Sequence, residues 1–368
     1  MNHSDEHLNN DEKSLLQSVS IGRLIIPVIL GVGVVLYLMH KQLDLGELSK
    51  LTLTIKTVWW LMVAVGCYIM RHLFYSWRLS EMTGQAFSFK KSLQLIVIWE
   101  FATAASPTSV GGAGVALILL AQEKISGAKT VTVVLYSMVI DTIYAVVMLP
   151  LAYFLIGPQI IRPGMSSLSD LDGYGLTFLI VLFIMLAYGS VFFYGLFLNP
   201  RGLKRFLLLL SKIPFLGKFR TDLRKTALDV IVAANEIKTK DKSFHIKNGF
   251  YTFGAWTIRF FAINTIILAL IPNTSLAFMD QMTILARGLS MHVTTSFSPT
   301  PGGAGIAEYL FGGYFSDYIP KGVASLVALI WRLISYYPYL LLGVVVIPIW
   351  IRSIIKQRRE AALASKTL

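Results

Sequence analysis

Seven ionisable side chains stand inside strongly apolar stretches of this 368-residue sequence. They are four arginines and three carboxylates: Arg71, Arg259, Arg287, Arg332, Glu100, Asp141 and Glu308. An ionisable group near the centre of a bilayer costs several kcal/mol unless it is paired or hydrated, so such residues commonly mark a binding site or a pathway. The guanidinium group offers a planar fork of donors that suits phosphate. These residues therefore predict a site for an anionic headgroup, with a structural ion pair as the alternative for each.

The choice between a binding role and a structural ion pair differs from one residue to the next. Arg71 and Arg259 lie nearer the ends of their apolar stretches, where a long cationic side chain can snorkel to the interface, so a structural role is an equal alternative for both. A binding role is favoured for the deeper residues Arg287, Arg332, Asp141 and Glu308. His292 is more typical of a packed histidine than of a proton relay.

Two motifs rich in Pro and Gly interrupt apolar stretches and nearly repeat each other. The first reads Ser-Pro-Thr-Ser-Val-Gly-Gly-Ala-Gly at 106–114, and the second reads Ser-Pro-Thr-Pro-Gly-Gly-Ala-Gly at 298–305. Pro removes a helical donor and Gly favours turns, so each motif should break a helix and bring backbone close to a ligand. The candidate site residues in the motifs are Gly111, Gly112, Gly114, Pro299, Gly302, Gly303 and Gly305. The alternative is that these small residues only let helices pack closely.

The apolar segments around the first motif are too short to span a membrane. Residues 92–105 would form a helix about 21 Å long, whereas the hydrocarbon core is ~30 Å thick. The segment 115–122 is shorter still. We predict a re-entrant hairpin at each motif, with the loop buried in protein or lining a cavity. The N-termini of the half-helices would add oriented N–H groups and a positive dipole end for an anion, and Glu308 would lie on the first turn of one of them.

Composition indicates a membrane protein. Hydrophobic residues make up 55% of the chain and charged residues 14%, with a mean hydropathy of +0.64. Apolar runs of spanning length are Ile21–Met39, Val58–Trp77, Thr130–Ile156, Tyr174–Leu198, Phe250–Ile271 and Val323–Ile351. The first run has an acidic flank and no small-residue cleavage site, so it is not expected to be a signal peptide. We expect an all-α polytopic membrane protein with about six full spans and two re-entrant hairpins.

The two motifs extend into a longer internal repeat. Aligning Gly111 with Gly302 places Asp141 opposite Arg332, and Arg71 roughly opposite Arg259. Each repeat would be one span, one hairpin and one span, and the two would have opposite orientations in the membrane. Such inverted repeats are typical of transporters, whose site lies at the repeat interface near mid-membrane. We therefore predict that Asp141 and Arg332 are partners across the two repeats.

Basic residues concentrate in segments that would share one side of the membrane. The +13 formal charge lies in loops beside apolar runs, so it indicates topology and contact with anionic lipids rather than nucleic acid binding. The segments predicted to be cytoplasmic are 1–23, 78–92, 122–130, 199–248 and 351–368. The stretch 201–247 would form one or two amphipathic helices on anionic inner-leaflet lipids, with a solvated linker as an equal alternative. The organisation is then a tail at 1–20, one membrane domain at 21–350 (repeat A 58–156, basic loop 199–248, repeat B 250–350) and a basic tail at 351–368.

The motif residues resemble a known family. Residues 299–308, Pro-Thr-Pro-Gly-Gly-Ala-Gly-Ile-Ala-Glu, are similar to the transmembrane flippase domain of the lysylphosphatidylglycerol synthase family, and the resemblance extends from about residue 20 to 350. Many relatives have Leu where this chain has Ala304, and the family's first motif often carries Arg, Gly and Glu where this chain has 109–114. We expect a stand-alone member that lacks the soluble synthase domain of the two-domain members. The resemblance implies a lipid translocator rather than an aminoacyl transferase. The asymmetry of basic residues predicts that both termini are cytoplasmic, and we expect the protein in the bacterial inner membrane.

Three functions compete at this stage. The first is a flippase for a phospholipid, which could be aminoacylated, or for a polyprenyl-phosphate-linked anion. The second is a membrane-embedded lipid-modifying enzyme, which Glu100 and Asp141 leave open although no catalytic motif is found. The third is a scaffold, and a homo-oligomer is also left open. Cys67 is the only cysteine and the six histidines lack ligand spacing, so neither a metal nor a cofactor is expected.

Overall fold

The computed structural model describes residues 54–106, 109–123, 125–170, 172–213 and 220–366, together with isolated positions 33, 37, 40 and 46. The expected first span Ile21–Met39 therefore lies outside the described residues apart from Gly33 and Tyr37. Every regular element in the described part is a helix, which confirms the all-α prediction. The long elements are α4 Ile55–Met82, α5 Phe89–Ala105, α6 Ser109–Ala121, α7 Gly127–Ile156, α8 Gly173–Phe193, α9 Pro200–Leu210, α10 Arg220–Lys238, α11 Lys242–Leu270, α12 Phe278–Thr295, α13 Ile306–Tyr314, α14 Lys321–Ser335 and α15 Tyr337–Lys366.

Side-chain caps define where several of these helices begin. Ser88 caps α5, Ser126 caps α7 and Asp241 caps α11, each by accepting a hydrogen bond from a backbone N–H of the first turn. Thr54 and Thr57 form a reciprocal capping box at the start of α4. The polar residues that flank the apolar runs therefore satisfy the free donors at the helix ends.

Five helical stretches are long and apolar enough to cross a membrane. They are Ile55–Met82, Gly127–Ile156, Gly173–Leu198, Lys242–Leu270 and the continuous α14–α15 stretch Lys321–Arg358. The stretch 173–198 has a mean hydropathy of 2.5, yet only 22% of its apolar window is buried against other parts of the protein. An apolar helix that is this exposed fits a lipid environment rather than water.

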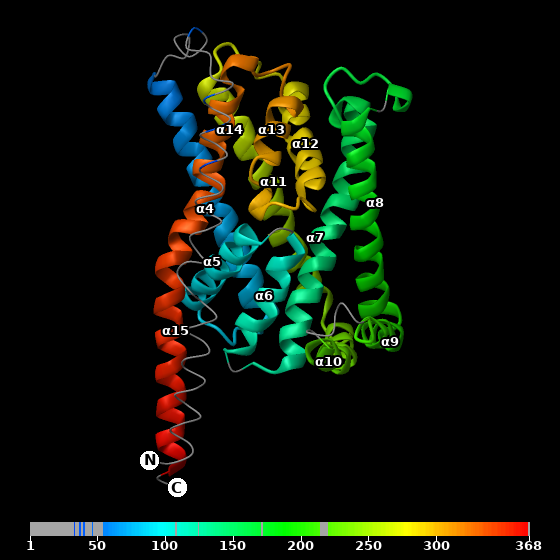
Figure 1. Cartoon of the computed structure of the whole chain (residues 1–368), viewed down its shortest axis with the longest axis vertical. Helices are drawn as coiled ribbons and strands as arrows, with labels where there is room; N and C mark the ends of the chain where they lie inside the picture. The colour runs from blue at the N-terminus through cyan, green and yellow to red at the C-terminus, as the bar shows by residue number, and fades with distance from the viewer. Residues whose placement is uncertain are drawn as a thin grey trace.

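Two pairs of shorter helices enter the bundle from opposite ends. Figure 1 shows α5 and α6 in the lower half, and α12 and α13 in the upper half. Each pair turns back near the middle of the bundle, at the positions of the two Pro- and Gly-rich motifs. The motifs touch there, because the Gly302 N–H donates to the Ser106 carbonyl over 3.1 Å. Beside them, the Tyr336 hydroxyl donates to the Ala104 carbonyl over 3.1 Å.

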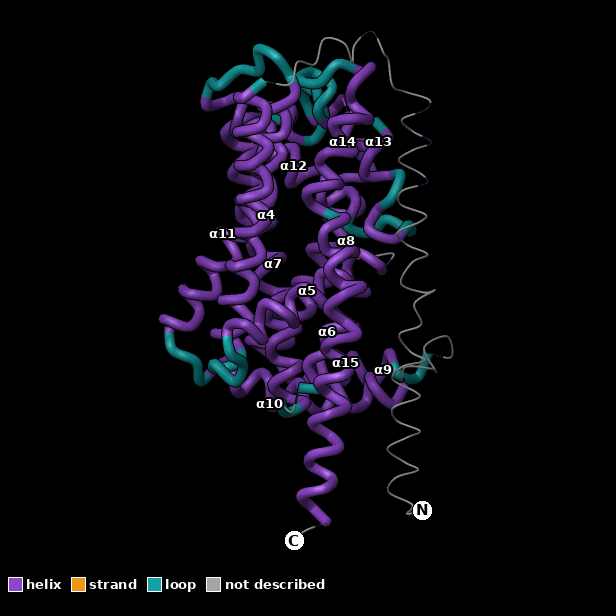
Figure 2. Tube along the Cα trace, turned by 90° about the vertical axis from the view of Figure 1, so that its left-hand side faces the viewer, coloured by secondary structure: helices purple, strands orange, loops and turns teal. Residues whose placement is uncertain are grey.

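The helices α4 and α11 lie side by side along the bundle (Figure 2). Phe74 of α4 packs edge-on against Phe250 of α11, with ring centroids 5.8 Å apart. A Cβ at Gly254 would come within 2.7 Å of the Phe74 ring, so glycine is what allows this close approach. This packing fixes the face of α4 that points toward the centre of the bundle.

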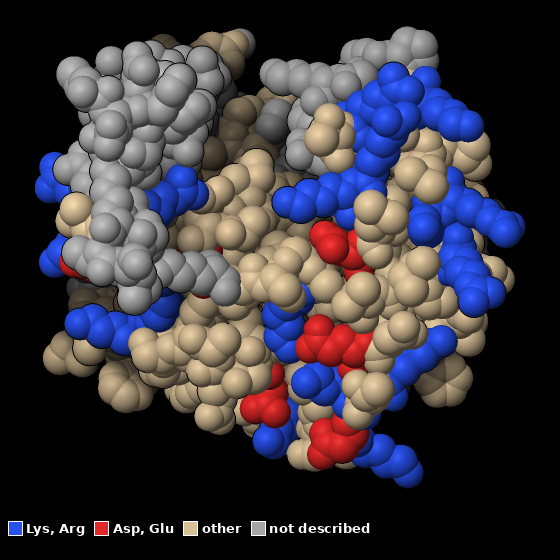
Figure 3. Space-filling view, turned by 90° about the horizontal axis from the view of Figure 1, so that it is seen from below, with Lys and Arg blue, Asp and Glu red and all other residues tan. Residues whose placement is uncertain are grey.

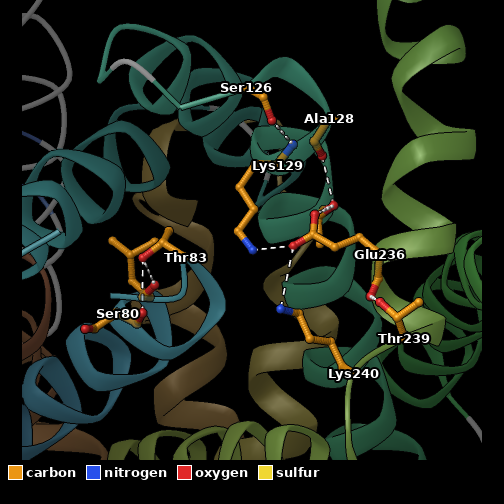
Figure 4. A network of polar contacts seen from close by, with 10 residues as sticks. Ser80, Thr83, Ser126, Ala128, Lys129, Glu236, Thr239 and Lys240 are labelled. Atoms are coloured by element: carbon orange, nitrogen blue, oxygen red, sulfur yellow. Dashed lines mark hydrogen bonds and ion pairs between the residues drawn. The ribbon is translucent and has the colours of Figure 1, made fainter. Parts of the chain in front are cut away.

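The basic stretch between α8 and α11 forms two helices at the lower end of the bundle (Figure 1). The helix α9 buries Leu203 and Leu207 and leaves its basic residues toward the outside. The helix α10 is held by Glu236, which binds Lys129 and accepts a 3.3 Å hydrogen bond from Thr132 on α7 (Figure 4). Seen from below, this end carries many Lys and Arg side chains (Figure 3). The amphipathic helices predicted for this stretch are therefore present.

Candidate functional site

A polar cavity of about 130 Å³ lies where the two motifs meet. It is far larger than the roughly 10–15 Å³ that one water molecule needs. Helices from both halves of the chain contribute to its wall. The residues that the argument uses are Arg71, Glu100, Ser106, Arg259, His292, Gly302, Gly303, Arg332, Tyr336 and Tyr339.

Two further cavities adjoin this one and share lining residues with it. A second cavity of about 170 Å³ shares Arg71, Glu100 and Arg259 with the first and adds Arg78 and Asp141. A third, of about 120 Å³, shares Asp141 with the second. All three are lined by His292. We refer to these three spaces as the cavity chain.

One face of α4 supplies two arginines to the cavity chain. Tyr68, Arg71, Tyr75 and Arg78 are spaced three and four residues apart, which places them on one side of a helix. The Tyr75 ring lies between the two guanidinium groups, 4.7 Å from each. Such cation–π contacts stabilise a guanidinium group that has left bulk water.

Arg71 is paired with Glu100. Its Nη2 donates to Glu100 Oε2 over 2.8 Å, and its Nη1 donates to the Tyr339 hydroxyl over 3.1 Å. The Arg71 Nε has no aligned hydrogen-bond acceptor among the described residues. Arg71 is 2% exposed, so snorkelling to the interface, which the sequence left open, does not occur here.

Asp141 is paired with Arg78, and the predicted pair of Asp141 with Arg332 is wrong. Asp141 Oδ1 accepts from Arg78 Nη1 over 2.5 Å and from Trp256 Nε1 over 2.8 Å. Arg78 also donates to the Thr252 hydroxyl over 3.1 Å. The physical reason is that Asp141 on α7 faces α4 and α11, whereas Arg332 faces the second helix break.

Sequence reasoning missed Arg78 because the apolar run appeared to end at Trp77. The segment 78–92 was expected to be a cytoplasmic loop, but α4 continues to Met82 and buries Arg78. The signal that could have found it is the spacing of seven residues between Arg71 and Arg78, which places both on one helix face.

Arg332 and Glu308 form the third buried ion pair, with Arg332 Nε 2.8 Å from Glu308 Oε1 and both side chains at most 6% exposed. The approach is close but poorly directed, because neither Nε nor Nη2 of Arg332 makes an aligned hydrogen bond to a described residue. Glu308 Oε2 accepts a 2.7 Å hydrogen bond from the Gly305 N–H and so caps α13. Arg332 therefore keeps buried donors that can serve an incoming oxygen atom.

The second motif makes the tight backbone turn that the sequence predicts. Gly302, Gly303 and Gly305 have positive φ values of 57°, 71° and 84°. A Cβ on Gly302 would lie 2.2 Å from a ring carbon of Tyr336, and one on Gly303 would lie 3.8 Å from Arg332 Nη2. This backbone therefore approaches the cavity wall in a way that only glycine allows. Pro299 lies at the same turn but is exposed.

The first motif differs from the second. The helix α6 already begins at Ser109, so Gly111, Gly112 and Gly114 are helical and the predicted tight turn at Gly111–Gly112 is wrong. A Cβ on Gly112 would lie 2.0 Å from the Thr103 hydroxyl oxygen, so this glycine lets α5 and α6 pack closely. The packing alternative therefore holds for Gly112, while Gly114 has no atom within 4 Å of an added Cβ.

Arg287 does not join the cavity chain. It is fully buried at the middle of α12, where Nε donates to the Gln159 carbonyl over 2.9 Å and Nη1 donates to Asp317 over 2.5 Å. Its guanidinium group also lies 5.5 Å from the centre of the Tyr318 ring. These contacts tie the connection after α7 to the end of α13, which is a structural role.

The helices and the cavity chain together define a polytopic helical membrane protein with a cationic central site. Among the described residues, no group of three or more His, Cys, Asp or Glu side chains gathers as a metal site would. The chain matches the lysylphosphatidylglycerol synthase TM region over residues 24–343, and it belongs to this family. The resemblance inferred from residues 299–308 is thereby confirmed.

One curated relative extends the same comparison. A UPF0104 membrane protein of Archaeoglobus fulgidus is 23% identical over 314 residues, which cover 81% of this chain and 89% of that protein. The family and the apolar helices identify a multi-pass membrane protein, and the family is consistent with a protein that handles lipids.

Proposed function

We propose that this protein moves a phospholipid or a lipid-linked anion across the inner membrane. The observation that carries the proposal is the cavity chain, in which three arginines line the cavity where the two helix breaks meet and a fourth, Arg78, lines the adjoining cavity. A phosphate group that crosses a hydrocarbon medium needs donors that replace its water, and guanidinium groups supply them in a fixed geometry. Buried donors of Arg71 and Arg332 without aligned partners in the described structure are suited to that role.

The arrangement of the helices supports a transport cycle. The pair α5–α6 opens toward the end that carries α9 and α10, and the pair α12–α13 opens toward the other end (Figure 1). We propose that both pairs are re-entrant hairpins of an inverted repeat, with both termini and α9–α10 in the cytoplasm. Alternating access then follows when one repeat rocks against the other around a site at their interface.

The test is lipid movement in vesicles that contain the purified full-length protein. Labelled phospholipids, aminoacylated lipids and polyprenyl phosphates are placed in one leaflet, and their arrival in the other is timed. At least one anionic lipid should move about tenfold faster than in protein-free vesicles, and it should be recovered chemically unchanged. Chemical conversion of the lipid would instead favour the enzyme, and movement of the whole panel at the protein-free rate would overturn transport.

A matched pair of variants connects the movement to the site. Arg332→Gln removes the buried donors at the second motif and should slow lipid movement strongly. Arg162→Gln, in the connection between α7 and α8, removes an arginine whose side chain is 35% exposed and lies outside the cavity chain. This control should retain the rate of the unaltered protein.

A further inference from the structure

Arg259 differs from the other three arginines of the cavity chain. Arg71, Arg78 and Arg332 each have a carboxylate oxygen within 2.8 Å. No carboxylate of the described residues forms an ion pair with Arg259. Its guanidinium group lies over the Trp256 ring, 5.1 Å from the ring centre. It lines both the first and the second cavity, so a ligand in either space can reach it.

The cavity chain therefore holds one more positive than negative group. Four arginines line it, against two lining carboxylates, Glu100 and Asp141, and a third, Glu308, which pairs with Arg332; His292 is counted as neutral. Arg259 is half-buried, and a charge that is drawn out of water without an ion-pair partner is costly, so the excess must be hydrated or neutralised by a ligand. Each of the three carboxylates already forms an ion pair with another arginine, so an anionic ligand can supply the missing negative charge.

Two arginines of the first cavity can donate to one anion. Arg259 and Arg332 both line it, and the Arg332 Nη2 is buried with no aligned acceptor among the described residues. A phosphodiester brings one negative charge and two free oxygen atoms, which matches the single excess charge. A phosphate monoester or a diphosphate brings further negative charge, and a zwitterionic headgroup leaves its amine beside a cationic wall.

We infer that Arg259 selects lipid headgroups of one net negative charge, which are held by the phosphodiester between Arg259 and Arg332. The inference rests on the proposed function and narrows its substrate class. It separates phosphatidylglycerol from phosphatidylethanolamine, which is zwitterionic, and from lysylphosphatidylglycerol, whose added amines make the headgroup net positive.

Two measurements on the full-length protein test this selectivity, both at pH 7.5 with those three lipids as probes. The first is retention of each lipid by the detergent-solubilised protein, measured by native mass spectrometry. The second is movement of each labelled lipid in reconstituted vesicles. In both, phosphatidylglycerol should exceed each of the other lipids about tenfold. Arg259→Gln should remove most of that preference, while Arg259→Lys, which keeps the charge, and the control Arg162→Gln should retain it.

The two measurements separate failure of the inference from failure of the proposed function. Retention that favours phosphatidylglycerol and depends on Arg259, without any lipid movement, would support the selectivity and overturn transport. Equal retention and movement of all three lipids, or an unchanged preference in well-folded Arg259→Gln, would overturn the selectivity and leave transport standing. If Arg259→Gln does not fold, the inference is tested by the preference for phosphatidylglycerol in the unaltered protein and in Arg259→Lys. Absence of that preference in both proteins overturns the inference.

Discussion

The pairing of Asp141 with Arg78 can be measured as a coupling free energy. Two unit charges about 4 Å apart interact by about 4 kcal/mol at an effective dielectric constant of about 20. Breaking a buried pair by removing one partner typically costs ~3–5 kcal/mol. The Asp141 side chain is 27% exposed and the Arg78 side chain is 8% exposed, so partial hydration reduces the effect. We expect a coupling of about 2–3 kcal/mol between these two side chains.

The assay is a double-mutant cycle on reversible unfolding in mixed micelles of denaturing and mild detergent. The variants are Asp141→Asn, Arg78→Gln and their combination. Asn keeps an acceptor for Trp256 Nε1, so the cycle isolates the ion pair. The control cycle combines Asp141→Asn with Arg332→Gln, which shares no contact with Asp141, and should be additive within about 0.5 kcal/mol.

The larger of the two coupling free energies, Asp141 with Arg78 or Asp141 with Arg332, decides between the observed pairing and the pairing predicted from the repeat. Exchange of the charges, Arg78→Asp with Asp141→Arg, should recover much of the stability that either single change removes. Coupling of Asp141 to Arg332 that exceeds its coupling to Arg78 would refute the pairing described here.

Three further predictions concern other parts of the molecule. Gly302→Ala should destabilise the detergent-solubilised protein by about 1–3 kcal/mol in thermal unfolding, because φ is positive there and a ring carbon of Tyr336 obstructs Cβ. The control Gly114→Ala, at a helical position, should be neutral or stabilising in the same experiment. Hydrogen bonds from the Ser166 hydroxyl and from the backbone N–H groups of Ser166 and Ser167 lower the pKa of Asp170 to about 2. These contacts therefore stabilise the loop above the ordinary pKa of 3.8 and are lost as the pH falls from there through about 2. Amide exchange normalised to an unstructured peptide should rise over that interval in the unaltered protein, and an identical profile in Asp170→Asn would contradict this assignment. In a Cys67→Ala background, a cysteine at Arg201 should resist an impermeant thiol reagent added outside intact cells, and rapid labelling would reverse the proposed orientation.

The fold was predictable because it depends on long apolar runs and on strong breakers. Four of the predicted spans coincide with α4, α7, α8 and α11, and the fifth with α14–α15. The turn at Gly302–Gly305 was equally predictable, since Pro precedes glycines that adopt positive φ. The first motif has Ser and Val in place of that second Pro, and the helix accordingly starts before its glycines. The residue types inside a motif therefore predict the position of a helix break better than the overall match between two motifs does.

The partners of the buried charges were less predictable. A span assigned from hydropathy ends where the first charged residue appears, so Arg78 was left out of the predicted helix. Its spacing from Tyr75 and Arg71 nevertheless favours a place on the same buried helix face. Alignment of the two motifs pairs positions by number, but a contact depends on the direction of each side chain. Asp141 and Arg332 occupy matching positions and yet face different neighbours.

The distribution of the buried ion pairs bears on how the protein could move. Arg71–Glu100 and Arg78–Asp141 both lie within segment 58–156, and Glu308–Arg332 lies within segment 250–350. No ion pair of the cavity chain joins these two segments among the described residues. The contacts that do join them there are hydrogen bonds, such as those from Gly302 to Ser106 and from Tyr336 to Ala104.

Relative motion of the two segments would therefore break hydrogen bonds rather than buried ion pairs, whose loss of one partner costs ~3–5 kcal/mol. Hydrogen bonds between neutral groups have a net value of about 1 kcal/mol each, and those that involve a charged group, from Arg71 to Tyr339, from Arg78 to Thr252 and from Trp256 to Asp141, have about 1.5–3 kcal/mol. Each segment carries its own compensated charges, and the exception is Arg259, whose excess positive charge lies at the interface between the segments. Three of the arginines and the three carboxylates stabilise one another as ion pairs, which is a structural role. The fourth arginine, Arg259, has no such ion pair to offset its partial desolvation. A ligand that supplies the missing negative charge would form one, and it would be bound where the two segments can move apart.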